Sequence, residues 1–285
     1  MKAIFLTLFT MPLALANPFE PSSIPADANW YLHGNLTALR ETKTGKMVVA
    51  FIRETQSGAL NEIENIFEFN PLTDLTGVTL FGSGKANEGA AIIRGNFSKA
   101  RFEQVIEHAD NHRTSAHGPV TVHQWDDKGK TQYAGFHDEK TIIISPQKDS
   151  VLLGLDVLSK DKPGLPADTV LPAKNPSLVA YANVNKIDMP DDEGSRIVRR
   201  AKSLTVTLGE NQGRLEMAMV AETNDAMTTQ RMAKVMEGLI SLGQLADENI
   251  SALDINHTSK VTGKTMTMTM DLSATKALEI LSEMQ

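Results

Sequence analysis

A proline-rich stretch near the middle of the chain does most to limit how it can fold. Residues 161–176 contain Pro163, Gly164, Pro166, Pro172 and Pro176. Proline interrupts helices and cannot donate to a strand ladder, so this stretch is predicted to be a linker. It divides the 285 residues into two parts, each large enough to bury a core of its own.

The two parts repeat one order of predicted elements: strand, helix, strand, glycine-rich turn, strand, helix, hairpin and helix. The clearest match sets the turn at 84–89 against the turn at 209–213. We therefore predict an α+β protein made of two tandem ferredoxin-like (split βαβ) repeats, with antiparallel sheets and helices packed on one face. The repeats are expected over residues 29–160 and 177–285, after an irregular lead-in over 17–28.

The first sixteen residues have the pattern of a secretory signal. Lys2 supplies a positive start, residues 3–13 are apolar, and Ala14-Leu15-Ala16 is a small-x-small cleavage site before Asn17. The apolar run is shorter than the roughly 20 residues that a membrane-spanning helix needs. We expect an exported mature chain without a transmembrane segment, in the periplasm or outside the cell.

Composition excludes several functions. The chain has no cysteine, which excludes disulfides, Cys-ligated metals and Cys nucleophiles. Its net charge is −7, which argues against nucleic acid as a partner.

Three segments resemble those of a group of uncharacterised exported bacterial proteins built as tandem α+β repeats. They are the strand Ala91–Phe97, the strand Lys140–Ser145 and the helix Val151–Leu158. The matching stretches are 75–106 and 135–158, with a looser match in the second half. The resemblance implies a repeated architecture and export, and it assigns no functional residue.

Five of the seven histidines lie within thirty residues: His108, His112, His117, His123 and His137. His108 and His112 have the i, i+4 spacing that lets two imidazoles on one helix face reach one metal ion. The alternative is a solvated helix end, where positive charge is favourable, followed by a polar loop. We expect separately solvated histidines and no metal site.

Methionines gather in the second part, where Met266, Met268 and Met270 alternate with threonines along one predicted strand. Converging thioethers suit Cu(I), and exposed ones suit an adaptable partner surface. The interpretation we favour is core packing beneath a helix that carries Met232 and Met236.

Other motifs fall short of a catalytic pattern. Gly82-Ser83-Gly84-Lys85 lacks the spacing of a phosphate loop and is expected to be a hairpin turn. The acidic groups Asp126-Asp127 and Asp191-Asp192-Glu193 could serve acid–base work or calcium binding, but solvated or capping carboxylates are the ordinary finding in a loop or at a helix start. A basic patch is expected to be the solvent-facing side of a helix. That patch consists of Arg196, Arg199, Arg200 and Lys202.

We therefore assign no catalytic, cofactor-binding or metal-binding residue and no cofactor. The expected function is that of an exported non-catalytic protein, a binding or scaffold module acting through its sheet faces or the groove between the repeats. Its partner, a protein or a small ligand, and its oligomeric state stay open. The alternative is a metal-handling protein or hydrolytic enzyme that uses the histidine-rich segment 108–137.

Overall fold

The computed structural model describes residues 18–85, 88–173, 176–189 and 193–283. The predicted signal at 1–16 and the first residue of the lead-in lie outside them. Within the described residues, no helix combines the length and the apolar character that a membrane span requires.

The first half contains seven strands and six α-helices. The strands are β1 (Trp30–Asn35), β2 (Leu75–Gly82), β3 (Gly89–Gly95), β4 (Arg113–His117), β5 (Val120–Asp127), β6 (Lys130–Asp138) and β7 (Thr141–Ser145). The helices are α1 (Leu36–Glu41), α2 (Lys43–Thr55), α3 (Ser57–Phe67), α4 (Pro71–Asp74), α5 (Lys99–Glu107) and α6 (Lys148–Leu158). A 3₁₀ turn, Pro21–Ser23, precedes β1.

The second half is smaller. Its strands are β8 (Leu178–Asn183), β9 (Ala201–Asn211), β10 (Arg214–Thr223), β11 (Asn256–Thr262) and β12 (Thr265–Ser273). Its helices are α7 (Glu193–Val198), α8 (Ala226–Ala246), α9 (Glu248–Ala252) and α10 (Ala274–Glu283), with a 3₁₀ turn at Val184–Lys186.

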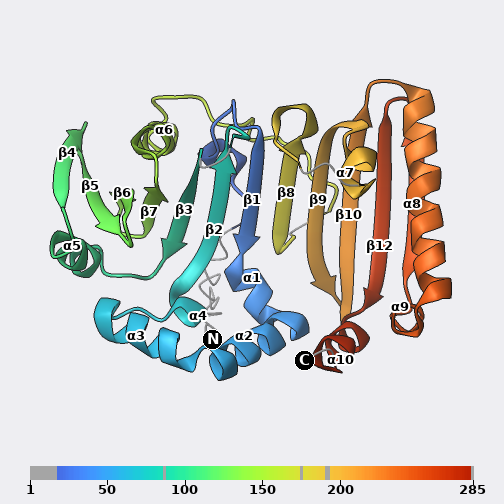
Figure 1. Cartoon of the computed structure of the whole chain (residues 1–285), viewed down its shortest axis with the longest axis horizontal. Helices are drawn as coiled ribbons and strands as arrows, with labels where there is room; N and C mark the ends of the chain where they lie inside the picture. The colour runs from blue at the N-terminus through green and yellow to red at the C-terminus, as the bar shows by residue number, and fades with distance from the viewer. Residues whose placement is uncertain (1–17, 86–87, 174–175, 190–192, 284–285) are drawn as a thin grey trace, which may run out of the picture.

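All twelve strands form one antiparallel sheet, in the order β11-β12-β10-β9-β8-β1-β2-β3-β7-β6-β5-β4 (Figure 1). The α+β class is confirmed, but the expectation of separate sheets is wrong. The first strands of the two halves pair directly, and Tyr31 of β1 lies opposite Tyr181 of β8. The stacked rings of these tyrosines, 5.1 Å apart between centroids, reinforce this seam.

The split βαβ order is also wrong. In that order, the strands before and after the first helix are parallel and have a third strand between them. Here β1 and β2 are direct antiparallel neighbours. The reason is visible in Figure 1: α1, α2 and α3 lie beyond the lower ends of the strands, so the chain re-enters the sheet from the end at which it left.

Helices cover both faces of the first half, contrary to the expectation of one. Along β7, Ile143 packs in one cluster with Val151 and Leu155 of α6. Its neighbour Ile142 points to the other face, in a cluster with Phe102 of α5. Because successive strand residues face opposite sides, Ile142 and Ile143 are buried on opposite faces of the sheet.

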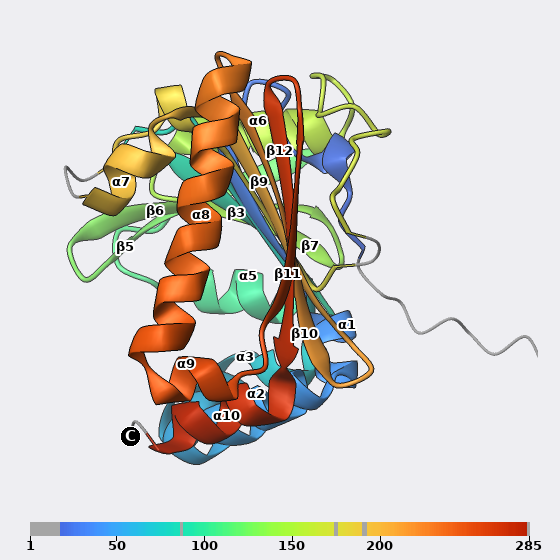
Figure 2. The same cartoon turned by 90° about the vertical axis from the view of Figure 1, so that its right-hand side faces the viewer.

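In the second half, α8 runs along one side of the sheet (Figure 2). Asp225 begins this helix by accepting a hydrogen bond from the backbone N–H of Thr228, as its sequence position suggests. Met232 of α8 packs on Met266 and Met268 of β12, which are 0% and 1% exposed. The core interpretation is confirmed for Met232, Met266 and Met268, whereas Met270 is only partly buried and lies outside this cluster.

The lead-in and the linker pack against each other at the central strands. Leu165 donates its backbone N–H to Ile24 O at 2.8 Å, and Pro25 bridges Gly164. A Cβ on Gly164 would lie 2.0 Å from Ser22 O, so only glycine permits this approach. Ile24 of the lead-in is completely buried, and Leu165 and Leu171 of the linker pack against its cluster, so both segments form part of the first core.

Candidate functional site

The histidines of segment 108–137 are dispersed, beginning at the end of α5. That helix ends at Glu107, and Asn111 adopts a left-handed conformation with φ 55°. His108 and His112 therefore do not lie on one helix face, although their i, i+4 spacing suggested that they would. The Nδ1 atom of His108 lies 2.7 Å from Gln104 O instead.

Two histidines do meet, across the predicted loop. His112 Nε2 lies 3.1 Å from His123 Nδ1, and the two rings stack with centroids 5.3 Å apart. His123 is 2% exposed, and its Nε2 is 3.7 Å from the carboxylate of Glu103. Burial lowers the pKa of His123, although Glu103 acts in the opposite direction. The pair is thus a packed, hydrogen-bonded unit, and the expectation that the histidines are separately solvated is wrong for these two rings.

The other two histidines lie elsewhere. His117 Nε2 is 2.6 Å from Asp156 on α6. His137 occupies the irregularity of β6 between Phe136 and Asp138. Among the residues that the structure describes, no three His, Asp or Glu side chains are grouped so as to hold a metal ion.

The remaining motifs have structural roles where they are described. Gly82–Lys85 belongs to the connection between the paired strands β2 and β3, as expected of a hairpin turn. The hydrogen bond from Asn111, followed in size by the one from Thr131, lowers the pKa of Asp126. These two bonds fix Asp126 at the end of the β5–β6 hairpin. The pair Asp191-Asp192 lies outside the described residues.

A large surface groove lies between the halves and has a volume of about 910 Å³. We call it the central groove. Its walls come from four separate segments: residues 38–43 of the first half, the C-terminal end of the linker, the β9–β10 hairpin and β12. The lining residues are Ala38, Glu41, Thr42, Lys43, Pro172, Ala173, Pro176, Ser177, Gly209, Glu210, Asn211, Gln212, Glu216, Met217, Ala218, Thr269, Met270 and Asp271.

Glu210 joins the two sides of the central groove. Its carboxylate accepts the backbone N–H groups of Lys43 at 3.0 Å and of Thr44 at 2.8 Å. These are among the first N–H groups of α2, which have no partner within the helix. Partial burial raises the pKa of Glu210, but the bonds from Thr44 and Lys43 outweigh burial, and the pKa lies below its usual range.

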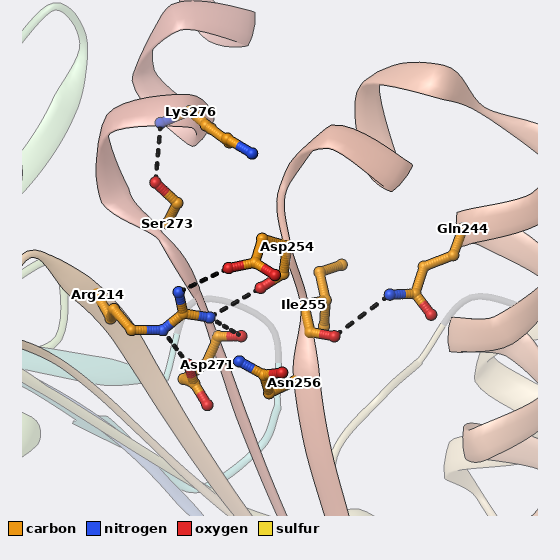
Figure 3. A network of polar contacts seen from close by, with 8 residues as sticks. All are labelled: Arg214, Gln244, Asp254, Ile255, Asn256, Asp271, Ser273 and Lys276. Carbon is orange, nitrogen blue, oxygen red and sulfur yellow. Dashed lines mark hydrogen bonds and ion pairs between the residues drawn. The ribbon is translucent and has the colours of Figure 1, made fainter.

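A second polar network supports the far wall (Figure 3). The guanidinium of Arg214 binds the carboxylate of Asp271 through Nε and that of Asp254 through Nη1, the latter at 3.0 Å. Its Nη2 also donates to Asp254 O at 2.8 Å. The Arg214 bond lowers the pKa of Asp271, so this lining carboxylate stays ionised and fixed in place.

The central groove is rich in acceptors. Of the described residues, those that line it include four carboxylates, Glu41, Glu210, Glu216 and Asp271, and one cation, Lys43. Lys43 Nζ is bound to the Thr275 hydroxyl at 2.7 Å. No nucleophile–base pair appears among these residues, and their chemistry favours binding of a ligand that donates hydrogen bonds.

Sequence reasoning identified none of these groove residues individually. They come from segments far apart in the chain, so no local spacing marks them. The nearest indication was the general expectation that a ligand lies between the repeats.

Neither a known family profile nor a curated protein matches the chain. Among solved structures, it is similar to crystal form III of TP0453, with 12% identity and a TM-score of 0.54 over 93% of this chain and 98% of that one. It is likewise similar to crystal form IV of TP0453, with 10% identity and a TM-score of 0.51 over 93% and 97% of the two chains. At this identity the likeness concerns the fold alone.

Proposed function

We propose that the protein is a non-catalytic binding module whose ligand occupies the central groove. The observation that carries the proposal is that both halves and the linker contribute to one groove of about 910 Å³. That volume lies near the upper end for small-ligand sites and accommodates a few residues of an extended peptide.

The charges of the groove select the ligand class. The carboxylates of Glu41 and Glu216 are on exposed residues, and Pro172 and Pro176 provide apolar wall. A short polypeptide segment with a basic side chain matches both features, because its cation meets carboxylates and its apolar atoms meet proline.

In-cell photo-crosslinking tests this function. A photoreactive residue at Gln212, on the groove rim, should capture one defined partner, whereas the same residue at Lys128, on the distant β5–β6 hairpin, should not. The charge reversals Glu41→Lys and Glu216→Lys should abolish the Gln212 product. Equal products from both positions, or no effect of the reversals, would contradict the proposal.

Export is the second part of the proposal. It rests on the signal pattern of residues 1–16. N-terminal sequencing of the protein recovered from the cell envelope or medium should begin at Asn17, and an intact Met1 on the exported protein would refute it.

We also infer that the two halves descend from one repeated unit. The strands β1-β2-β3 run outward from the seam on one side, as β8-β9-β10 do on the other. Superposition of residues 29–160 on 177–283 should align these triplets, and alignment in any other order would count against duplication.

The alternative function is metal handling or hydrolysis by segment 108–137. The approach of His112 to His123, beside Glu103, is the observation that favours it. The melting temperature of the chelator-treated protein, measured with and without added zinc, distinguishes the two functions. We expect zinc to cause no change. A stoichiometric rise that disappears in His112→Ala would favour the metal function.

A further inference from the structure

We propose a second binding site, for a small organic anion with an aliphatic portion, between α7 and α8. A depression of about 410 Å³ lies there, on the side of the sheet that α8 covers. It is separate from the central groove, and none of its lining residues is shared with that groove.

Three arginines supply the charge of this site. Arg196 and Arg200 come from α7 and the residues after it, and Arg231 comes from the second turn of α8. No carboxylate lines the depression among the described residues, although the whole chain has a net charge of −7. Guanidinium groups bind carboxylate and phosphate through paired N–H donors, so this convergence selects an anion.

Asp225, an acidic residue at the start of α8, is already engaged. Asp225 accepts the Thr228 N–H at 2.8 Å and the Thr228 hydroxyl at 2.7 Å, where it begins α8. The backbone hydrogen bond from Thr228 is the largest cause of a lowered pKa at Asp225, the hydroxyl bond is the next, and the charge of Arg231 acts in the same direction. Asp225 therefore offsets part of the positive charge without occupying the depression.

The floor of the site is apolar. Ile197, Met232 and Val235 line it beside the arginines. Val235, which is 42% exposed, also begins an exposed apolar stripe along α8 that continues through Leu239 and Leu242, at 50% and 61% exposed. Their i, i+4, i+7 spacing places the three side chains on one helix face.

A ligand that fits both features has a carboxylate or phosphate on the arginines and an alkyl chain on the floor. The chain then continues along the stripe of α8. Each methylene that reaches apolar surface strengthens binding by up to about fourfold.

Isothermal titration of the mature chain tests the site, with octyl phosphate and octanoate as probes below their micelle concentrations. Both should bind with one-to-one stoichiometry, and their relative affinities tell a phosphate ligand from a carboxylate one. Inorganic phosphate tests the need for the chain, and octyl glucoside tests the need for charge. Both should bind at least tenfold more weakly than octyl phosphate.

Variants locate the binding. The double substitution Arg200→Gln, Arg231→Gln should weaken octyl phosphate at least tenfold, and Arg200→Lys should have an intermediate effect because lysine keeps the charge but loses the paired donors. Arg53→Gln, on exposed α2, is the matched control and should change nothing. The site is refuted if neither probe binds, if either comparison ligand binds as tightly as octyl phosphate, or if the control loses as much affinity as the double variant.

Discussion

Some titratable side chains are buried or partly buried, and the groups around each of them decide how it responds to pH. His123 is the clearest case. It is 2% exposed, and it is surrounded by His112 and by the carboxylates of Glu103 and Glu107. Burial nevertheless dominates and lowers its pKa.

A lowered histidine pKa makes stability fall in acid. The unfolded chain takes up this proton near pH 6.5, whereas the folded chain resists it to a lower pH. The contribution of His123 to stability is therefore complete above about pH 6.5 and decreases as pH falls below that value. We expect His123→Gln to flatten this part of the curve of unfolding free energy against pH, measured by urea denaturation.

Glu210 has the same sign of proton linkage, over a more acidic range. Its pKa is lowered in the folded state, so its stabilising effect is present above the unfolded pKa and is lost as pH falls through the folded value. Glu210→Gln should cost about 1 kcal/mol at neutral pH, because a charged group at a helix start contributes on that order. Denaturant unfolding measures the loss. Glu216→Gln, on the same groove, should stay within about 0.5 kcal/mol.

At the scale of elements, packing distinguishes residues that look alike in the sequence. Met266 is buried, and Met227 of α8 is 61% exposed. Met266→Ala should lower the free energy of unfolding by about 2 to 5 kcal/mol through the cavity it leaves. Met227→Ala should change it by less than about 0.5 kcal/mol, and similar losses in both would contradict the described core.

Two helical glycines should respond to alanine with opposite signs. A Cβ on Gly45 would lie 1.8 Å from Leu39 O, where α1 turns into α2, whereas a Cβ on Gly58 meets nothing within 4 Å. Gly45→Ala should cost about 1 to 3 kcal/mol through overpacking. Gly58→Ala should gain about 0.5 to 1 kcal/mol from helix propensity. Melting curves of the two variants should move in opposite directions.

Elements with a strong local signal could be predicted from the sequence. The helix begun by Asp225 and the turn between β9 and β10 are examples, because the cap and the glycine act within a few residues, although β9 extends to Asn211, into the turn expected at 209–213. The strand β4 was missed, and its segment was expected to be helix end and loop. Its residues, Arg113–His117, are polar and form an edge, so they lack the alternation that burial of one face imposes.

At the scale of the whole molecule, the sequence indicated the class and the two-part organisation but not the assembly of the parts. Pairing of β1 with β8 depends on contacts between distant segments, and no local pattern specifies which strand meets which. The same holds for the central groove, whose walls become neighbours only after this pairing.

One continuous sheet predicts one cooperative unit. Calorimetry of the mature chain should give a single unfolding transition, because separating the halves would expose the backbone of both β1 and β8. Residues 18–160 expressed alone should aggregate, or should become soluble only when mixed with 177–285. Two separate transitions, with each half folded on its own, would contradict the single-sheet description.

The pairing of β1 with β8 also affects the order in which parts of the sheet can form. Tyr31 and Tyr181 face each other although they lie about 150 positions apart along the chain. Bringing such distant segments together carries a large loop-closure entropy, and non-local pairings of this kind form slowly. During synthesis, β1 has no β8 to pair with until residues 178–183 have been made. Until then the edge of β1 that faces β8 is unpaired, and it is the edge that most needs protection from other chains.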